Sequence, residues 1–324
     1  MLTAQIMRNF RIVRDWADAG YFETDSLRQL RDDVLAAIRA GRLVAICGPV
    51  GSGKTMMMNR LQHDIAAEKD IIVARSLSVD KPRVTLPNLI MALFLDISAD
   101  PNLKAPTQPE RRERLLQELV RKARKPVVLF IDEAHDIHGH TLNGLKRLME
   151  LILAGGGKLS VVLVGHPRLQ NDLRRATMEE IGDRTSKFDF VALGDQRQEF
   201  LRWLLEGCLD EDVDPDSVIA PQAQDFLVER LSTPLQFAEH LNRAFTDTFH
   251  LGAEKVTREI VENTLSAGFD NLDAKLARIG YTPKALAERF DAHPTEIRRF
   301  LSGRLDPDRT AELGAALRDA GIPT

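Results

Sequence analysis

The stretch Leu43-Val44-Ala45-Ile46-Cys47-Gly48-Pro49-Val50-Gly51-Ser52-Gly53-Lys54-Thr55 decides the fold of this 324-residue chain. A short apolar run of strand type leads into a glycine-rich turn, and a helix is expected from Thr55 to Glu68. Residues 48–55 match the pattern G-x-x-x-x-G-K-[ST], which binds phosphate groups between a strand and a helix. The stretch therefore predicts a phosphate site at the end of a buried strand.

Each fixed position of this loop has a physical reason. The glycines let successive backbone N–H groups curl around phosphate oxygens, and the helix that follows adds its positive N-terminal dipole. We expect Lys54 to reach the β- and γ-phosphates and the Thr55 hydroxyl to bind Mg²⁺. The expected cofactors are ATP and Mg²⁺. The residues expected to bind them are Gly48, Gly51, Ser52, Gly53, Lys54, Thr55 and Asp132.

An acidic pair, Asp132 and Glu133, follows another apolar run, Val127–Ile131. An acidic residue at the end of a buried strand beside a phosphate loop is suited to hold Mg²⁺ through water, and Asp132 is expected to do so. Glu133 is then expected to orient and polarise the attacking water, since phosphoryl transfer depends on positioning. A helix cap is the alternative interpretation of this pair. The nearby His135, His138 and His140 straddle a turn without a fourth ligand, so no metal site is expected there.

Strands and helices alternate around these motifs. Apolar runs predict strands at 43–47, 71–74, 127–131, 159–164 and 188–193, and helical patterns fall at 86–97, 110–124 and 141–154. Strands that are apolar throughout indicate a parallel sheet covered by helices on both faces, which is an α/β fold. From about residue 196 every segment has helical periodicity.

This change of pattern predicts four parts of the chain. Residues 1–24 are expected to form an N-terminal helix, which spans 3–19 and ends at Gly20. A nucleotide-binding core is expected at 25–195, a helical lid at 196–268 and a small helical unit at 272–324.

Composition excludes several classes of protein. The net charge of -4 gives no overall sign of nucleic-acid binding, so any such role must come from local basic patches. Two cysteines in no ligand spacing argue against a disulfide framework or a zinc site. No apolar run reaches the length of a membrane span, and residues 1–16 do not resemble a signal peptide. A cytoplasmic protein with no membrane contact is expected.

The sequence resembles the AAA+ ATPases of bacterial DNA transposition, of the TniB, TnsC and Mu B type, and their relatives of the ExeA type. The resemblance covers residues 20–265 and implies an AAA+ core with an all-α lid, followed here by a helix-turn-helix-like C-terminal unit. It also implies ATP hydrolysis by a hexameric ring or a helical filament. The segments that carry the resemblance are residues 48–55, 130–135, 162–167 and 233–236.

The resemblance also assigns two further site residues. In such proteins a polar side chain after the fourth strand senses the γ-phosphate, which makes His166 the candidate; a turn histidine without a role is the alternative. An arginine just before the fifth strand enters the neighbouring subunit's site, and Arg184 stands there, with Arg174 and Arg175 as rivals. The lid departs from the family, because residues 232–236 lack the arginine that many AAA+ lids carry. Turnover is therefore expected to be slow and switch-like.

Two regions are candidates for DNA contact. Residues 104–125 hold eight basic and three acidic side chains, and residues 282–291 with 294–301 resemble a helix-turn-helix. The net charge of 283–304 is only +2, from five basic and three acidic residues, so this unit is open to either DNA or protein binding. The candidate DNA-binding residues are Lys81, Arg83, Lys104, Arg111, Arg112, Arg298 and Arg299.

These features favour an ATP-dependent, oligomerising DNA-binding regulator of DNA transposition. Its expected partners are double-stranded DNA, a transposase or other transposition proteins, and further copies of itself. An ExeA-type secretion or envelope ATPase and an ATP-switched transcription regulator are the alternatives.

Overall fold

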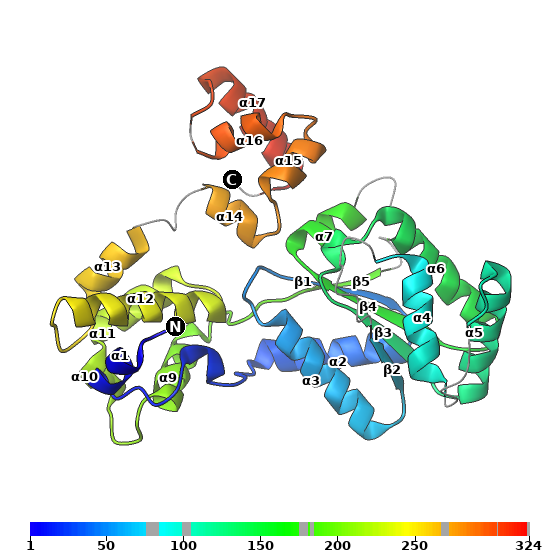
Figure 1. Ribbon diagram of the computed structural model, residues 1–324, viewed down its shortest axis with the longest axis horizontal. Helices are drawn as coiled ribbons and strands as arrows, with labels where there is room; N and C mark the ends of the chain where they lie inside the picture. Colours follow the sequence, from blue (N-terminus) through cyan, green and yellow to red (C-terminus); the bar gives the residue numbers. More distant parts are fainter. Residues whose placement is uncertain are drawn as a thin grey trace. The chain divides into compact units, whose positions relative to one another are not determined.

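The computed structural model describes residues 1–75, 84–98, 105–174, 181, 185–266, 272–302 and 304–322. The chain divides into two compact units, drawn in Figure 1. Residues 28–48 and 54–190 form one, here called the sheet unit. Residues 1–27, 49–53 and 191–324 form the other, here called the helical unit.

The sheet unit is built on five parallel strands in the order β2-β3-β4-β1-β5. Every residue of β1, β3 and β4 is buried, because helices cover both faces of the sheet. The predicted parallel α/β sheet is confirmed. The strands are β1 (Leu43–Cys47), β2 (Ile72–Arg75), β3 (Val127–Ile131), β4 (Leu159–Gly165) and β5 (Thr185–Asp189).

Successive side chains of each strand point to opposite faces of the sheet, and a layer of helices covers each face. On one face, Ala45 and Leu129 share a core with helices α4 (Leu86–Ile97), α5 (Pro109–Ala123), α6 (Gly139–Ala154) and α7 (Pro167–Leu173). Figure 1 shows α3 (Lys54–Glu68) and α2 (Asp25–Arg39) on the opposite side, where Val34, Ile38 and Leu61 are fully buried. The helices predicted at 86–97, 110–124 and 141–154 agree with α4, α5 and α6 to within two residues.

The fifth strand begins earlier than predicted. An apolar run placed it at 188–193, whereas β5 spans Thr185–Asp189 and pairs with β1 from Leu43↔Thr185 to Cys47↔Asp189. β5 is the last strand in the order, and its middle residues are only half-buried. A strand at an edge does not need to be apolar, so the search for apolar runs missed its first three residues.

The predicted N-terminal helix over 3–19 is wrong in extent. Only α1 (Ala4–Asn9) and a 3-10 turn, η1 (Trp16–Asp18), are helical. The helix ends because Arg11 adopts a positive φ of 55° and Ile12 forms a β-bridge with Leu209. Pairing with a distant segment of the helical unit therefore replaces the helical hydrogen bonds that periodicity favoured.

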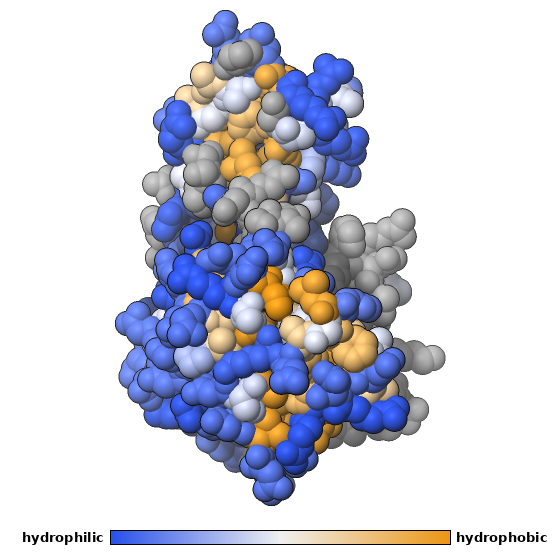
Figure 2. Space-filling view, turned by 90° about the vertical axis from the view of Figure 1, so that its left-hand side faces the viewer, coloured by the Kyte–Doolittle hydropathy of each residue, from blue (hydrophilic) through white to orange (hydrophobic). Residues whose placement is uncertain are grey.

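From Arg197 on, the described elements of the helical unit are helices, as predicted, apart from an isolated bridge. Residues 191–266 hold α9 (Arg197–Cys208), α10 (Pro215–Val218), α11 (Pro221–Arg230), α12 (Pro234–His250) and α13 (Arg258–Ser266). Thr233 caps α12 in a capping box with Gln236, which explains why a helix starts at this Thr-Pro pair. On the side shown in Figure 2, hydrophilic residues cover most of the surface, with hydrophobic ones showing between them.

The C-terminal residues form four short helices with an apolar core of their own. They are α14 (Leu272–Arg278), α15 (Pro283–Arg289), α16 (Pro294–Leu301) and α17 (Pro307–Asp319). The predicted helix-turn-helix segments coincide with α15 and α16. Leu286, Ile297 and Leu301 lie in the core, and Phe290 packs against it half-buried. Across the described parts of the chain, none of the helices combines the length and the hydropathy needed to cross a bilayer.

Candidate nucleotide-binding site

The phosphate loop connects β1 to α3, as its sequence predicts. Gly51 has a φ of 73° and Gly53 a φ of 98°, which L side chains rarely adopt, so both positions require glycine. The Gly48 N–H donates to the Gly165 carbonyl over 3.1 Å and ties the start of the loop to the end of β4. Helix α3 begins at Lys54, and its N-terminal dipole therefore faces the loop.

Lys54 is a buried cation at the first turn of α3. Its side chain is only 7% exposed, and its Nζ donates to the Gly48 carbonyl over 2.9 Å. Burial lowers the pKa of Lys54, and the negative charges of Glu133 and Asp132 oppose this shift. An ammonium held against the loop by backbone and carboxylates is suited to bind an anion that the loop encloses.

Thr55 and Asp132 meet although they lie 77 positions apart in the sequence. The Thr55 hydroxyl donates to Asp132 Oδ2 over 2.9 Å, because the end of β3 lies near the start of α3. A hydroxyl and a carboxylate are oxygen ligands, which Mg²⁺ prefers. The residues present at this point therefore fit a divalent metal beside the phosphate loop.

Glu133 has an unusual backbone conformation. Its φ of 54° and ψ of 35° are left-handed, and its N–H donates to Asp132 Oδ1 over 2.8 Å. A non-glycine residue in this conformation costs free energy and is often found at functional sites. The turn leads into η3 (Ala134–Asp136) and holds the carboxylate, 31% exposed, at the end of β3.

Two histidines accompany Glu133. His135 lies in η3 and His166 caps the N-terminus of α7, directly after β4, and their ring centroids are 3.9 Å apart. A Cβ at Gly165 would lie 3.3 Å from the His135 backbone nitrogen, so this glycine permits the close approach of the two turns. Burial lowers the pKa of His135, and burial and the neighbouring His135 lower the pKa of His166 to about 4. Both rings are therefore neutral at pH 7.

The sequence alone did not suggest that His135 belongs to this group. It grouped His135 with His138 and His140, but those two side chains are exposed and do not join it. His166 comes instead from the neighbouring strand β4, 31 positions further along the chain. The available signal was a histidine following each of two apolar strands, at 135 and 166.

Several predicted residues lie elsewhere. Arg184, its rival Arg175, Lys81, Arg83 and Lys104 lie outside the described residues. The other rival, Arg174, is the C-cap of α7. Arg111 is exposed on α5, whereas Arg112 is half-buried there; Arg298 and Arg299 are exposed in the last turn of α16.

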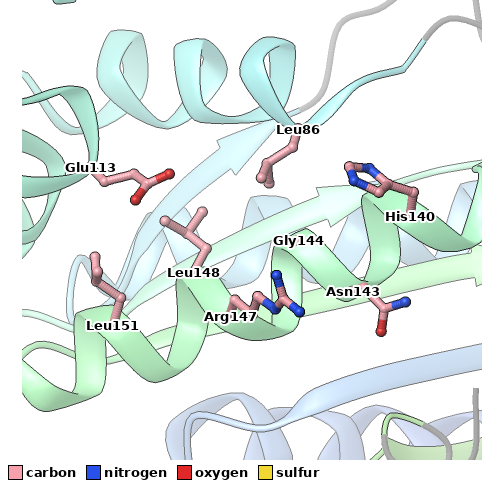
Figure 3. Close-up of a pocket in the computed structure, with 8 residues that line it drawn as sticks. All are labelled: Leu86, Glu113, His140, Asn143, Gly144, Arg147, Leu148 and Leu151. Atoms are coloured by element: carbon pink, nitrogen blue, oxygen red, sulfur yellow. The ribbon is translucent and has the colours of Figure 1, made fainter. Parts of the chain in front are cut away.

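A pocket in the sheet unit does not contain these motifs. It has a volume of about 400 Å³ and lies beside α4, α5 and α6 (Figure 3). Three leucines and four polar side chains line it, with Gly144: Leu86, Leu148, Leu151, Glu113, His140, Asn143 and Arg147. A nucleotide needs the backbone donors and cation of the phosphate loop, so we place the nucleotide at residues 48–55 instead.

Comparison with known proteins finds a family over this part of the chain. Residues 38–173 match the protein family described as AAA domain. The chain is 27% identical over 229 residues to General secretion pathway protein A of Aeromonas hydrophila, which covers 67% of this chain and 39% of that protein. The chain thus spans less than half the length of this curated relative.

Solved structures share the fold over nearly the whole chain. The ORC2 protein of Aeropyrum pernix in its ADP form superposes with a TM-score of 0.57 at 15% identity, covering 97% of this chain and 90% of that chain. The ORC1 protein of the same organism, in complex with DNA, gives a TM-score of 0.50 at 16% identity, covering 96% and 89%. At these identities the likeness concerns the fold alone. With the family match over residues 38–173, the fold is that of the P-loop AAA+ proteins.

Proposed function

We propose that this ATPase is an ATP-dependent, oligomerising DNA-binding regulator of DNA transposition that works in the cytoplasm. It marks double-stranded target DNA and recruits or activates a transposase. The observation that carries the proposal is a concentration of positive charge on one helix and the residues just after it, in an ATPase whose overall net charge is -4.

The chemistry of the switch is ATP hydrolysis with Mg²⁺. The glycines of the phosphate loop, with Ser52, surround the phosphates, and Lys54 supplies a positive charge against them. Thr55 and Asp132 hold Mg²⁺, which neutralises charge on the phosphate oxygens when bound.

Glu133 accepts a proton from, and orients, the attacking water. Its left-handed backbone holds the carboxylate near His166, the proposed sensor of the γ-phosphate. A neutral His166 can donate one hydrogen bond to a phosphate oxygen without adding a charge. Arg184 precedes β5 directly and is proposed to reach the site of a neighbouring subunit, as in the family that the sequence resembles.

Helix α5 is the proposed DNA-contacting element. Between residues 105 and 125 there are seven basic and three acidic side chains, a net charge of +4. Leu116 and Val120 bury one face of the helix in the core. The exposed basic residues on its other faces are Arg111, Arg114, Arg121 and Lys122, and Arg124 and Lys125 are exposed just after its end. Such a row favours phosphate contacts, which carry no sequence preference.

The four C-terminal helices are proposed to dock a partner protein or to adjust DNA contact. The two exposed arginines, Arg298 and Arg299, supply only a small positive charge for independent DNA binding. A ring or filament would repeat α5 at intervals, so weak phosphate contacts from several subunits would add up.

Salt-dependent DNA binding tests this proposal. We expect ATP-dependent binding to random-sequence duplex DNA. We expect the triple substitution Arg111→Ala, Arg114→Ala and Arg121→Ala to flatten the slope of log affinity against log salt by about 3. A matched control removes three exposed arginines of the helical unit, Arg202, Arg258 and Arg318, and changes the net charge equally. Equal slopes for the two triple variants would refute the role of α5.

A secretion ATPase is the second candidate. The 27% identity to General secretion pathway protein A favours it. The same titration separates the two, because this candidate needs no DNA binding. An ATPase that fails to bind duplex DNA at low salt, with ATP or a non-hydrolysable analogue, would exclude the transposition regulator.

A further inference from the structure

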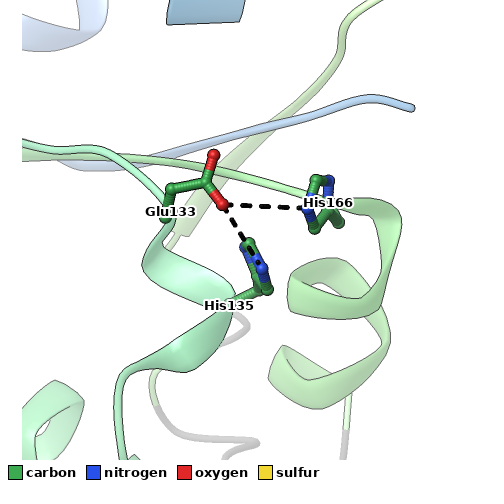
Figure 4. Close-up of side chains that lie close together, drawn as sticks. All are labelled: Glu133, His135 and His166. Carbon is green, nitrogen blue, oxygen red and sulfur yellow. Dashed lines mark ion pairs between the residues drawn. The ribbon is translucent and has the colours of Figure 1, made fainter. Parts of the chain in front are cut away.

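Three possible metal ligands converge at the carboxyl ends of β3 and β4. Figure 4 shows Glu133, His135 and His166 pointing toward one another from two separate turns. Glu133 Oε2 lies 3.6 Å from His135 Nε2 and 3.8 Å from His166 Nε2. One ligand atom from each side chain lies within 4.8 Å of the other two.

This spacing suits a shared ion better than direct contact. Hydrogen bonds between such atoms are about 2.7–3.2 Å long, so neither of these two contacts is a hydrogen bond. A zinc ion with ligands at about 2.0–2.1 Å in tetrahedral geometry separates neighbouring ligand atoms by about 3.4 Å. The two separations measured from Glu133 Oε2 are within a few tenths of an ångström of that value.

The two histidine side chains are largely shielded from solvent. The His135 and His166 side chains are 9% and 13% exposed. Their Nδ1 atoms are buried and have no hydrogen-bond partner among the described residues. Coordination would use the Nε2 atoms, which face the partly buried carboxylate of Glu133, and a cation between them would pair with that negative charge.

We propose that Glu133, His135 and His166 bind a divalent transition-metal ion of the Zn²⁺ class, which inhibits ATP hydrolysis. Two imidazoles and one carboxylate are typical zinc ligands and leave a fourth position open. The site is distinct from the oxygen ligands of Thr55 and Asp132, which suit Mg²⁺. A metal here holds the Glu133 carboxylate and keeps it from the attacking water. This inhibitory part rests on the proposed role of Glu133, whereas the binding part does not.

Metal binding by the nucleotide-free full chain tests the site. We expect one Zn²⁺ per chain by calorimetry, and a Co²⁺ absorption spectrum of the tetrahedral type. His135→Ala and His166→Ala should each weaken Zn²⁺ binding by more than about 100-fold, since even second-shell changes cost about 10–100-fold. The matched controls are His138→Ala and His140→Ala, two exposed histidines on the same turn, which should leave the affinity unchanged.

Thermal unfolding shows whether each variant is folded. The midpoint temperature of unfolding is first measured for every protein without metal. Added Zn²⁺ should then raise the midpoint temperature of the parent but not that of His135→Ala or His166→Ala. If Zn²⁺ binds and stabilises all five proteins equally, the site is refuted.

Inhibition is tested by measuring the hydrolysis of Mg²⁺-ATP after Zn²⁺ is added. The Zn²⁺ concentration is kept far below the nucleotide concentration. One equivalent of Zn²⁺ should stop hydrolysis by the parent. A protein that binds Zn²⁺ at these residues and still hydrolyses ATP at full rate would overturn inhibition. If the parent hydrolyses no ATP even without Zn²⁺, the proposed function fails, while the binding experiment still decides the metal site.

Discussion

The phosphate-loop end of the sheet and the four C-terminal helices use polar residues in opposite ways. At the sheet, Lys54, His135 and His166 are buried or nearly so, and their pKa values are lowered. In the C-terminal helices the core is apolar, while Arg298 and Arg299 are exposed. Burying a polar group costs free energy that must be offset by partners, so buried polar clusters mark chemistry and exposed charges mark recognition.

The two regions should therefore fail differently when changed. A substitution at the sheet should remove catalysis with little effect on the C-terminal helices. A substitution in the C-terminal core should unfold those helices and leave hydrolysis intact. The expected effects below run from the largest to the smallest.

Glu133→Gln should give the largest effect on rate. Loss of a general base typically slows a reaction by about 10²–10⁴-fold, and we expect hydrolysis to fall by that factor while ATP still binds. Asp136→Asn, a change to an exposed acid on the same turn, is the control and should hydrolyse ATP normally. Steady-state hydrolysis and ATP binding, measured side by side, check this. Hydrolysis at the parental rate by Glu133→Gln would show that the role is wrongly assigned.

Lys54→Ala should strongly weaken nucleotide binding. Hydrogen bonds to charged groups are worth about 1.5–3 kcal/mol each, so losing two to phosphate should weaken binding by about 10²-fold or more. Lys158→Ala is a matched control, because Lys158 also donates to a backbone carbonyl, that of Arg39, but just before β4, at the opposite edge of the sheet. Calorimetric titration with ATP measures both. Similar losses in the two variants would contradict the assignment.

Leu286→Ala should act on the C-terminal helices alone. Leu286 is 1% exposed in their core, and replacing a buried leucine with alanine costs about 2–5 kcal/mol. Hydrogen exchange over residues 272–322 should accelerate while the ATP hydrolysis rate stays unchanged. Arg298→Ala, an exposed change in the same helices, should not accelerate exchange. A loss of hydrolysis in Leu286→Ala would show that the two regions are coupled.

The smallest expected effect is that of acid, which should lower the stability of each unit because a largely buried histidine in it becomes protonated. Burial lowers the pKa to about 4 for His166 in the sheet unit and for His240 in the helical unit, below the ordinary value of 6.5. The unfolded chain then binds more protons between pH 4 and 6.5, so stability is complete above pH 6.5 and decreases as the pH falls toward 4.

Replacing either histidine separates the two contributions. His166→Asn and His240→Asn should each flatten the fall in thermal stability between pH 7 and pH 5. Segment-resolved hydrogen exchange at the two pH values assigns each effect to its unit. Parental pH dependence in both variants would mean that other groups cause the acid sensitivity.

Some of these structural features could be predicted from the sequence, and others could not. The phosphate loop, the strand before it and the acidic pair were evident from residues 43–55 and 127–133, because motif spacing and apolar runs are local features. Helices α4, α5 and α6 were placed to within two residues for the same reason. The start of β5 was missed, since an edge strand carries no apolar signature, and the N-terminal helix was overextended, since Ile12 pairs with a residue 197 positions away.

The sequence by itself was enough to predict which residues carry the phosphate chemistry. The glycines, Lys54, Thr55, Asp132 and Glu133 are proposed for this role from a contiguous motif and from the end of one strand. Only the tertiary structure decided that His166 lies against His135 and Glu133. Periodicity indicates where β3 and β4 end but not that they are neighbours in the sheet. Strand order depends on how the helices pack across both faces, and parallel pairing then brings the two carboxyl ends, with their histidines, to the same edge.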